Sequence, residues 1–493
     1  MLAPARRWLL PILALACLLP LQARGQEKDR WYTLDMMGGK VGWMHAAESR
    51  EGDRITTRSR MSISIARADG QASMSMESEF VETAAGEPVS MKRVQKFGTE
   101  AVTISYTFTK SVIEVTTTQG GTTSTSTAPL PEGAWLTPAA AERYSLQRFK
   151  SGAKEISVRT LAPETGPTPV TLTRKGFEKT TLEVMGRSLD AFKVTSENTA
   201  MPGSVSTEWI DAEGELLRTE TPLGATPIVM VRSTREEALA KSAAPSPDVM
   251  AHTLIKSDKP IPNAARLRKA VYLVSVAEGE LPDLPETGTQ RIQRLDAKSA
   301  RVTVTASPTT PAPQADLTDP AYTRATPLCD SNDVKIKELA AQAAKDRAGA
   351  ALAEACRAFV NRYIHDKNMD VGFATASEVA RTRSGDCSEH GVLLAALLRA
   401  NGIPARAAAG LVYVPELSGQ KHVFGYHMWA QALIDLDGVK QWVDLDGTLR
   451  THAYDPSHLT LALSPLDDSD PSGGMVGVAA FMGRLRISVE STE

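Results

Sequence analysis

Aromatic side chains and net charge are both scarce in this chain of 493 residues. Phe, Trp and Tyr make up 5% of it, so its cores must be built mainly from aliphatic side chains and 16 Met. The formal net charge of −3 excludes a strongly basic protein that binds nucleic acid. A mean hydropathy of −0.20 excludes a membrane protein with many spans. At the usual domain size, the length indicates about three domains.

Long hydrophobic runs are scarce as well, and the clear one lies at the N-terminus. Arg6 and Arg7 precede an apolar run over residues 8–21, and small residues follow it. This pattern predicts a secretory signal peptide at residues 1–25. The alternative is a lipoprotein signal with Cys17 as the lipidated residue, but the apolar run continues past that residue. We therefore expect an exported protein, periplasmic or extracellular.

Cysteine is also rare, and only Cys329, Cys356 and Cys387 follow the predicted signal peptide. An odd number in an oxidising compartment means one disulfide plus a free thiol, or three free thiols. Cys356 lies on the apolar face of a predicted helix, and Cys329 lies just before the preceding one. Two antiparallel helices can bring this pair together, which makes it the candidate disulfide and leaves Cys387 free.

Changes of pattern along the chain divide it into several parts. Alternation of apolar and polar residues, as in 61–65 and 102–108, predicts antiparallel strands before residue 241. From about residue 330 onward, helical periodicity precedes strand-like segments, which is typical of an α+β domain. The predicted parts are an antiparallel β domain that forms a curved sheet or half-barrel (26–241), a small β domain (249–306), a Pro-rich linker (307–320) and an α+β domain (321–493).

Cys387 lies where a helix is predicted to begin. The free N–H groups and the aligned peptide dipoles at a helix start favour negative charge, and therefore a thiolate. Such a thiolate is the usual form of a cysteine nucleophile. The alternative is a buried cysteine that only packs near the cap.

A thiolate catalyst needs an imidazole and an acceptor that orients it, and a predicted hairpin offers both. His427 lies on the first strand, and 440–446 is the returning strand. If 436–437 form the turn, His427 faces Asp446; if 437–438 form it, His427 faces Thr448. Asp446 is within reach in either register, because diagonal neighbours on paired strands lie about 7–8 Å apart. His422 falls before the strand, in a predicted loop.

Three segments resemble the transglutaminase-like superfamily. They are Gly385-Asp386-Cys387 with the helix that follows, Tyr426-His427-Met428-Trp429, and Trp442-Val443-Asp444-Leu445-Asp446. The resemblance covers about residues 330–450 and implies a papain-like α+β fold. It also implies Cys387 as nucleophile, His427 as base and Asp446 as the residue that orients it. Tyr426 and Trp429 flank the histidine and are the candidates for substrate binding.

The resemblance implies acyl transfer on an amide or peptide bond through a thioester on Cys387, without a cofactor. The resemblance favours hydrolysis over cross-linking, because exported bacterial members of the family are more often hydrolases or of unknown activity. It implies a protein or peptide substrate. The backbone N–H of Cys387 would meet the oxyanion.

Two other classes of function compete with this hypothesis. One is a catalytically silent envelope scaffold whose β half binds lipid or protein at an envelope surface. The other is a metal site built from Cys387, His390, His422 and His427, although no second paired set of ligands with zinc spacing is present.

Overall fold

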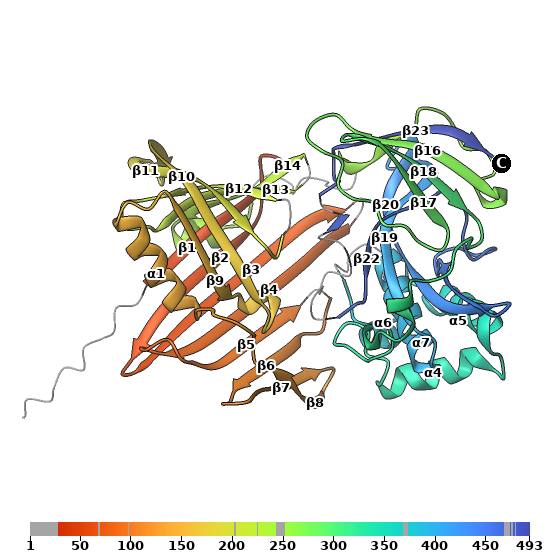
Figure 1. Ribbon diagram of the computed structural model, residues 1–493, viewed down its shortest axis with the longest axis horizontal. Coiled ribbons are helices and arrows are strands. Elements are labelled where there is room, and N and C mark those ends of the chain that lie inside the picture. Colours follow the sequence, from red (N-terminus) through yellow and green to blue (C-terminus); the bar gives the residue numbers. More distant parts are fainter. Residues whose placement is uncertain are drawn as a thin grey trace, which may run out of the picture.

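The computed structural model describes residues 28–67, 70–96, 98–201, 204–223, 225–242, 252–367, 373–467, 474, 477–478 and 480–493. The predicted signal peptide and Cys17 lie outside these residues. Within them, no helix combines the length and the apolar character needed to cross a membrane. Figure 1 shows a large sheet on one side and a smaller mixed α and β region on the other.

The N-terminal half is one antiparallel sheet of 14 strands in the order β8-β7-β6-β5-β4-β3-β2-β1-β14-β13-β12-β11-β10-β9. It therefore consists of two meanders that meet where β1 pairs with β14. The strands are β1 (Lys28–Met36), β2 (Gly39–Glu51), β3 (Arg54–Arg67), β4 (Gly70–Thr83), β5 (Pro88–Lys96), β6 (Val102–Phe108), β7 (Val112–Gln119), β8 (Thr122–Pro129), β9 (Glu155–Leu161), β10 (Pro169–Val184), β11 (Arg187–Asn198), β12 (Val205–Ile210), β13 (Leu216–Leu223) and β14 (Thr226–Ser233).

This sheet is curved, as predicted for a half-barrel. The short turn η1 (Pro163–Thr165), which follows β9 at one end of the strand order, lies against β4 and β5. There Glu164 accepts hydrogen bonds from Ser59 and Ser78, both at 2.8 Å. The helix α1 (Pro138–Lys150) also joins the two sides, because Glu82 accepts hydrogen bonds from backbone N–H groups of its first turn. These contacts hold the rolled sheet closed over its apolar residues.

The C-terminal half has the predicted α+β organisation, with helices packed on one sheet. Its sheet has the order β15-β20-β19-β22, and β21 pairs with β20. The strands are β15 (Ile255–Lys256), β19 (Ala405–Leu417), β20 (Gln420–Leu436), β21 (Val439–Leu445) and β22 (His458–Ser464). The helices are α4 (Val334–Ala344), α5 (Gly349–Tyr363), α6 (Ala376–Thr382) and α7 (Cys387–Ala400). A short α2 (Arg235–Leu239) belongs to the N-terminal half, where it packs on β1 and β2.

The helix α7 is the centre of this half. Nearly every residue in it is buried, because α4, α5 and α6 surround it on one side and β19 and β20 on the other. Buried helices of this kind are apolar all round rather than on one stripe. The resulting core holds both ends of α7 in place.

The predicted small β domain does not stand alone in the structure. Its sheet, in the order β17-β18-β16-β23, takes its edge strand β23 (Leu485–Thr492) from the end of the chain. The other strands are β16 (Lys269–Val276), β17 (Gln290–Asp296) and β18 (Ser299–Thr305). Apolar residues of this sheet share one core with β19, β20 and β22. The predicted linker also packs on the α+β sheet, because Ala312 N–H donates to Lys440 O.

The two halves meet at α6. Thr99, in the turn between β5 and β6, donates through both its backbone N–H and its hydroxyl to Glu378. Gln119 donates to Ser377 and Asp330, at 3.1 and 3.0 Å. The N-terminal sheet therefore makes hydrogen bonds to α6, the helix that directly precedes α7.

Candidate active site

The local sequence fixes where α7 begins. Asp386 is the N-cap, and its carboxylate accepts from the N–H of Ser388 at 2.9 Å. Glu389 completes the capping box by accepting from the N–H of Asp386, and it also accepts from Ala374 N–H. Burial and then the negative charge of Asp386 raise the pKa of Glu389 to about 8. Cys387 is thereby placed, half-buried, at the first helical position.

The hairpin of β20 and β21 has the second of the two registers considered above. Leu436 pairs with Val439 and Ala430 with Leu445, so Asp437 and Gly438 form the turn. Both turn residues have positive φ, as a two-residue hairpin turn requires. Asp446 lies just past the end of β21, diagonal to His427, and the imidazole Nε2 donates to its Oδ2 at 2.8 Å.

The groups around His427 favour its protonated form. Burial alone would lower the pKa of His427, but the charge and hydrogen bond of Asp446 and then the Cys387 side chain raise it well above its ordinary value. Despite its burial, the pKa of Asp446 lies well below its usual range, because His427 and another histidine donate to it. Since Nε2 is occupied by Asp446, Nδ1 is the nitrogen that remains for the thiol of Cys387.

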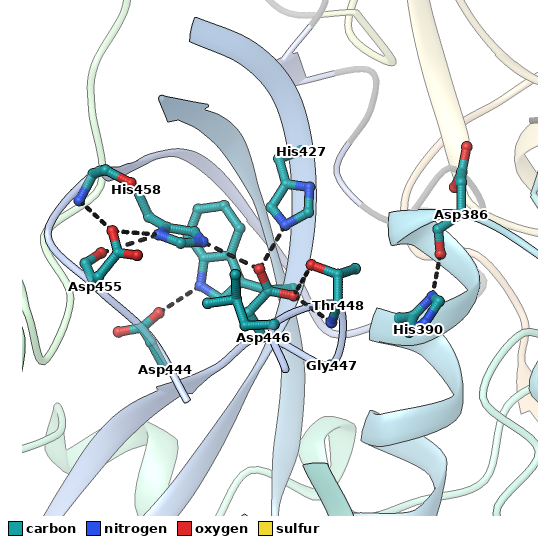
Figure 2. Close-up of polar contacts among 12 residues, drawn as sticks. Asp386, His390, His427, Asp444, Asp446, Gly447, Thr448, Asp455 and His458 are labelled. Atoms are coloured by element: carbon teal, nitrogen blue, oxygen red, sulfur yellow. Dashed lines mark hydrogen bonds and ion pairs between the residues drawn. The ribbon is translucent and has the colours of Figure 1, made fainter. Parts of the chain in front are cut away.

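Asp446 is held on all sides (Figure 2). Its Oδ1 accepts from the N–H and the hydroxyl of Thr448, both at 2.7 Å. Its Oδ2 accepts from His427 and, at 3.2 Å, from Nε2 of His458. The side chain is 1% exposed. A carboxylate with four donors has little freedom to turn away from the imidazole.

His458 is the residue at the site to which sequence analysis gave no role. It begins β22, on the far side of β19 from His427. The two imidazoles meet across β19 with ring centroids 5.7 Å apart. Gly410 lies between them, and a Cβ there would lie 2.0 Å from the carbonyl oxygen of Leu459. This close strand approach is a tertiary feature, so no local pattern indicates it.

A chain of alternating acids and histidines leads from His458 toward the surface. Nδ1 of His458 donates to the backbone oxygen of Asp455 at 3.0 Å, and the Asp455 carboxylate accepts from Nε2 of His452. Despite the opposing effect of burial, the hydrogen bonds and charges of Asp446 and Asp455 raise the pKa of His458 to about 9. His458 is therefore a cation that holds Asp446 in its ionised form.

The contact between His458 and Asp446 predicts a pH dependence of stability. A histidine with a raised pKa stabilises the fold fully below its unfolded pKa of about 6.5, and that stabilisation is lost as the pH rises through about 9. We expect the thermal unfolding midpoint to fall between pH 6.5 and 9, and this fall to be smaller in His458→Gln, because His427 is then the histidine beside Asp446 that still has a raised pKa. The control His422→Gln, far along β20, should keep the fall. An unchanged fall in His458→Gln would contradict the assignment.

The structure places the two predicted substrate contacts differently. Trp429 is fully buried, and its indole N–H donates to Asp444 at 2.7 Å, so it packs next to His427 and offers no surface to a substrate. Tyr426 is half-buried and packs against the core shared with the small sheet. For Tyr426, substrate binding stays a prediction.

The candidate disulfide is not formed, and Cys329, Cys356 and Cys387 are all free. Burial raises the pKa of Cys329 and of Cys356 to about 11, the first through its position in the core and the second on the apolar face of α5. Both are inert thiols. Cys387 is the one of the three that is not fully buried.

The proposed metal ligands do not converge. His422 lies within β20, where Nδ1 meets the hydroxyl of Tyr413, and His390 Nδ1 donates to the backbone oxygen of Asp386. Among the described residues, one group has metal-like spacing: His427, Asp446 and His458. There both Nε2 atoms lie within hydrogen-bond distance of the same carboxylate oxygen, so hydrogen bonds account for the close spacing of this group.

Comparison with known proteins gives one family match and several solved structures with low similarity. Residues 337–447 match the model of the transglutaminase-like superfamily. Solved structures with similarity include a β-barrel-like protein of domain of unknown function DUF1849 from Brucella abortus (14% identity, 43% of this chain and 96% of that one, TM-score 0.33). A putative cysteine protease from Cytophaga hutchinsonii also matches (14%, 46% and 86%, 0.27). A putative protease from Parabacteroides distasonis matches at 11% identity (59% and 69%, 0.18). No curated protein matches the chain.

Proposed function

From the transglutaminase-like domain at residues 337–447, we propose that this protein is an exported thiol hydrolase that cleaves amide or peptide bonds through a thioester on Cys387. The observation that carries the proposal is the position of His427. Its imidazole lies between a buried carboxylate and a half-buried thiol at the start of a helix. This is the arrangement that nucleophilic catalysis by cysteine requires.

The acylation step follows from these positions. The Cys387 sulfur attacks the carbonyl carbon, and the electron pair of the C=O bond moves to its oxygen. When the carbonyl re-forms, the C–N bond breaks and the proton of the His427 imidazolium passes to the leaving amine. Within the described part of the chain, the backbone N–H of Cys387 has no hydrogen-bond partner, so it is available to the oxyanion.

Deacylation reverses the proton transfer. His427, now neutral, takes a proton from water as the water oxygen attacks the thioester carbonyl. The C–S bond then breaks, which releases the carboxylic acid and restores the thiolate and imidazolium. Asp446 keeps the imidazole in one tautomer and orientation throughout and is not itself protonated.

The first test is the rate at which iodoacetamide alkylates Cys387, measured by mass spectrometry against pH. We expect rapid labelling at pH 6, where an ordinary thiol is protonated, and a decrease of about tenfold or more in His427→Ala. Cys329 and Cys356 serve as internal controls and should label only after unfolding. Slow labelling that rises only at alkaline pH in both proteins would overturn the proposal and favour the catalytically silent envelope scaffold.

A further inference from the structure

A positively charged cleft lies beside the proposed catalytic residues. Its volume is about 750 Å³. The residues that line it are Ala358, Asn361, Arg362, Ile364, His365, Lys367 and Arg450. Arg362, Lys367 and Arg450 are all exposed, and none of them forms an ion pair within the described residues. Three cations around one cleft, none of them in an ion pair with a described residue, make the local potential positive.

One wall of this cleft is tied to the loop that carries Asp446. Asn361, which lines the cleft, donates from Nδ2 to the backbone oxygens of Gly447 and Thr448, at 2.9 and 3.0 Å. Arg450 lies two residues further along the same loop. A Cβ at Gly447 would lie 3.3 Å from Cβ of His390, so this loop lies directly against α7. Figure 2 shows it facing the first turn of that helix.

The other wall is tied to the segment that carries Cys387. The backbone of Asp366 pairs with Ser384, and Gly385 N–H donates to Asp366 O at 3.0 Å. Lys367 follows directly, and its charge, after burial, contributes to the lowered pKa of His390 on α7. Asp366, the acid that precedes Lys367, accepts a hydrogen bond from Ser384. The cleft therefore lies between the segment that carries Cys387 and the loop that carries Asp446.

We propose that this cleft binds carboxylate groups of an acidic peptide substrate, with Arg362, Lys367 and Arg450 as the cations that recognise them. The inference rests on the proposed hydrolysis at Cys387 and names its substrate class. A carboxylate near the scissile amide fits because the cations are spread around the cleft and each can meet a separate acidic side chain. Arginine can also bind a carboxylate through two parallel hydrogen bonds.

The test separates binding from catalysis. Cys387→Ala would be titrated with three fluorescently labelled short peptide amides that carry Gln at the centre and Glu, Ser or Lys at the flanking positions. We expect the Glu peptide to bind about tenfold more tightly than the Ser peptide and the Lys peptide to bind most weakly. The preference should shrink in high salt, because salt screens exposed charges beyond a few ångströms.

The matched variants add Lys367→Gln and Arg450→Gln to Cys387→Ala, with Lys337→Gln and Arg347→Gln as the control pair of exposed cations away from the cleft. The first pair should remove most of the Glu preference and the second should leave it intact. Equal binding of the Glu and Ser peptides, or equal loss in both pairs, would overturn the inference. If the Glu peptide binds through the cleft but the wild-type protein does not cleave it, the proposed hydrolysis fails while the acidic preference stands.

Discussion

Replacing Asp446 with asparagine should lower kcat for amide hydrolysis strongly, by up to about 10⁴-fold, the loss found for the same replacement in a Ser-His-Asp triad. An amide presents an N–H₂ donor as well as an oxygen, whereas the two histidines that meet Oδ2 of Asp446 both donate protons. The substitution therefore turns the His427 ring or changes its tautomer. It also removes the charge that keeps the imidazole protonated.

The matched control is Asp444→Asn, which changes a buried carboxylate two residues away. Asp444 accepts from Trp429, Gln431 and Thr289, and it bonds neither histidine. Its replacement leaves a buried donor without a good acceptor, which costs about 1–3 kcal/mol of folding free energy. We expect a lower unfolding midpoint but alkylation of Cys387 at pH 6 close to that of the wild type.

Comparing the two variants therefore separates an effect on catalysis from an effect on stability. Asp446→Asn should lose low-pH alkylation together with hydrolysis, measured on the same preparation. Wild-type alkylation and hydrolysis in Asp446→Asn would show that the carboxylate does not orient His427. An equal loss in both variants would assign the effect to disruption of the hairpin.

Local patterns predicted much of the candidate site because Cys387, His427 and Asp446 each follow a local structural rule. Cys387 follows a capping aspartate, and His427 and Asp446 lie on a hairpin whose turn residues are visible in the sequence. The alternation in β6 matches its burial, with Val102, Ile104 and Tyr106 facing the core. In these segments the local preference and the tertiary fold agree.

The sequence did not predict features that depend on strands far apart along the chain. The edge strand β23 joins β16 across about 200 residues, so the small sheet could not be recognised as part of a shared core. His458 reaches Asp446 from β22, which lies so close to β19 at Gly410 that a Cβ there would meet the backbone of Leu459. Trp429 is of a residue type that often contacts substrates. It is buried because its indole N–H donates to Asp444 and its ring packs in the core.

Gly385→Ala should have the second large effect, because the start of α7 is built around the absence of a side chain there. Gly385 has φ of +143°, and a Cβ would lie 2.4 Å from Cβ and 2.3 Å from Cγ of Glu389. Glu389 cannot give way, since its carboxylate is buried and accepts from Asp386 and Ala374. Backbone strain alone costs about 1–3 kcal/mol, and the clash adds to it by displacing the first turn.

The expected result is a lower unfolding midpoint in urea together with loss of rapid alkylation at Cys387, because a displaced first turn no longer presents its N–H groups to the sulfur. Gly402→Ala is the control at the other end of the same helix. It also has a positive φ, of +78°, but a Cβ there has no neighbour within 4 Å. Its cost is limited to about 1–2 kcal/mol of backbone strain, and alkylation should be unchanged. If Gly385→Ala alkylates Cys387 as fast as Gly402→Ala does, the reactivity of the thiol does not depend on the geometry of the helix start, and the charge of His427 alone must support it.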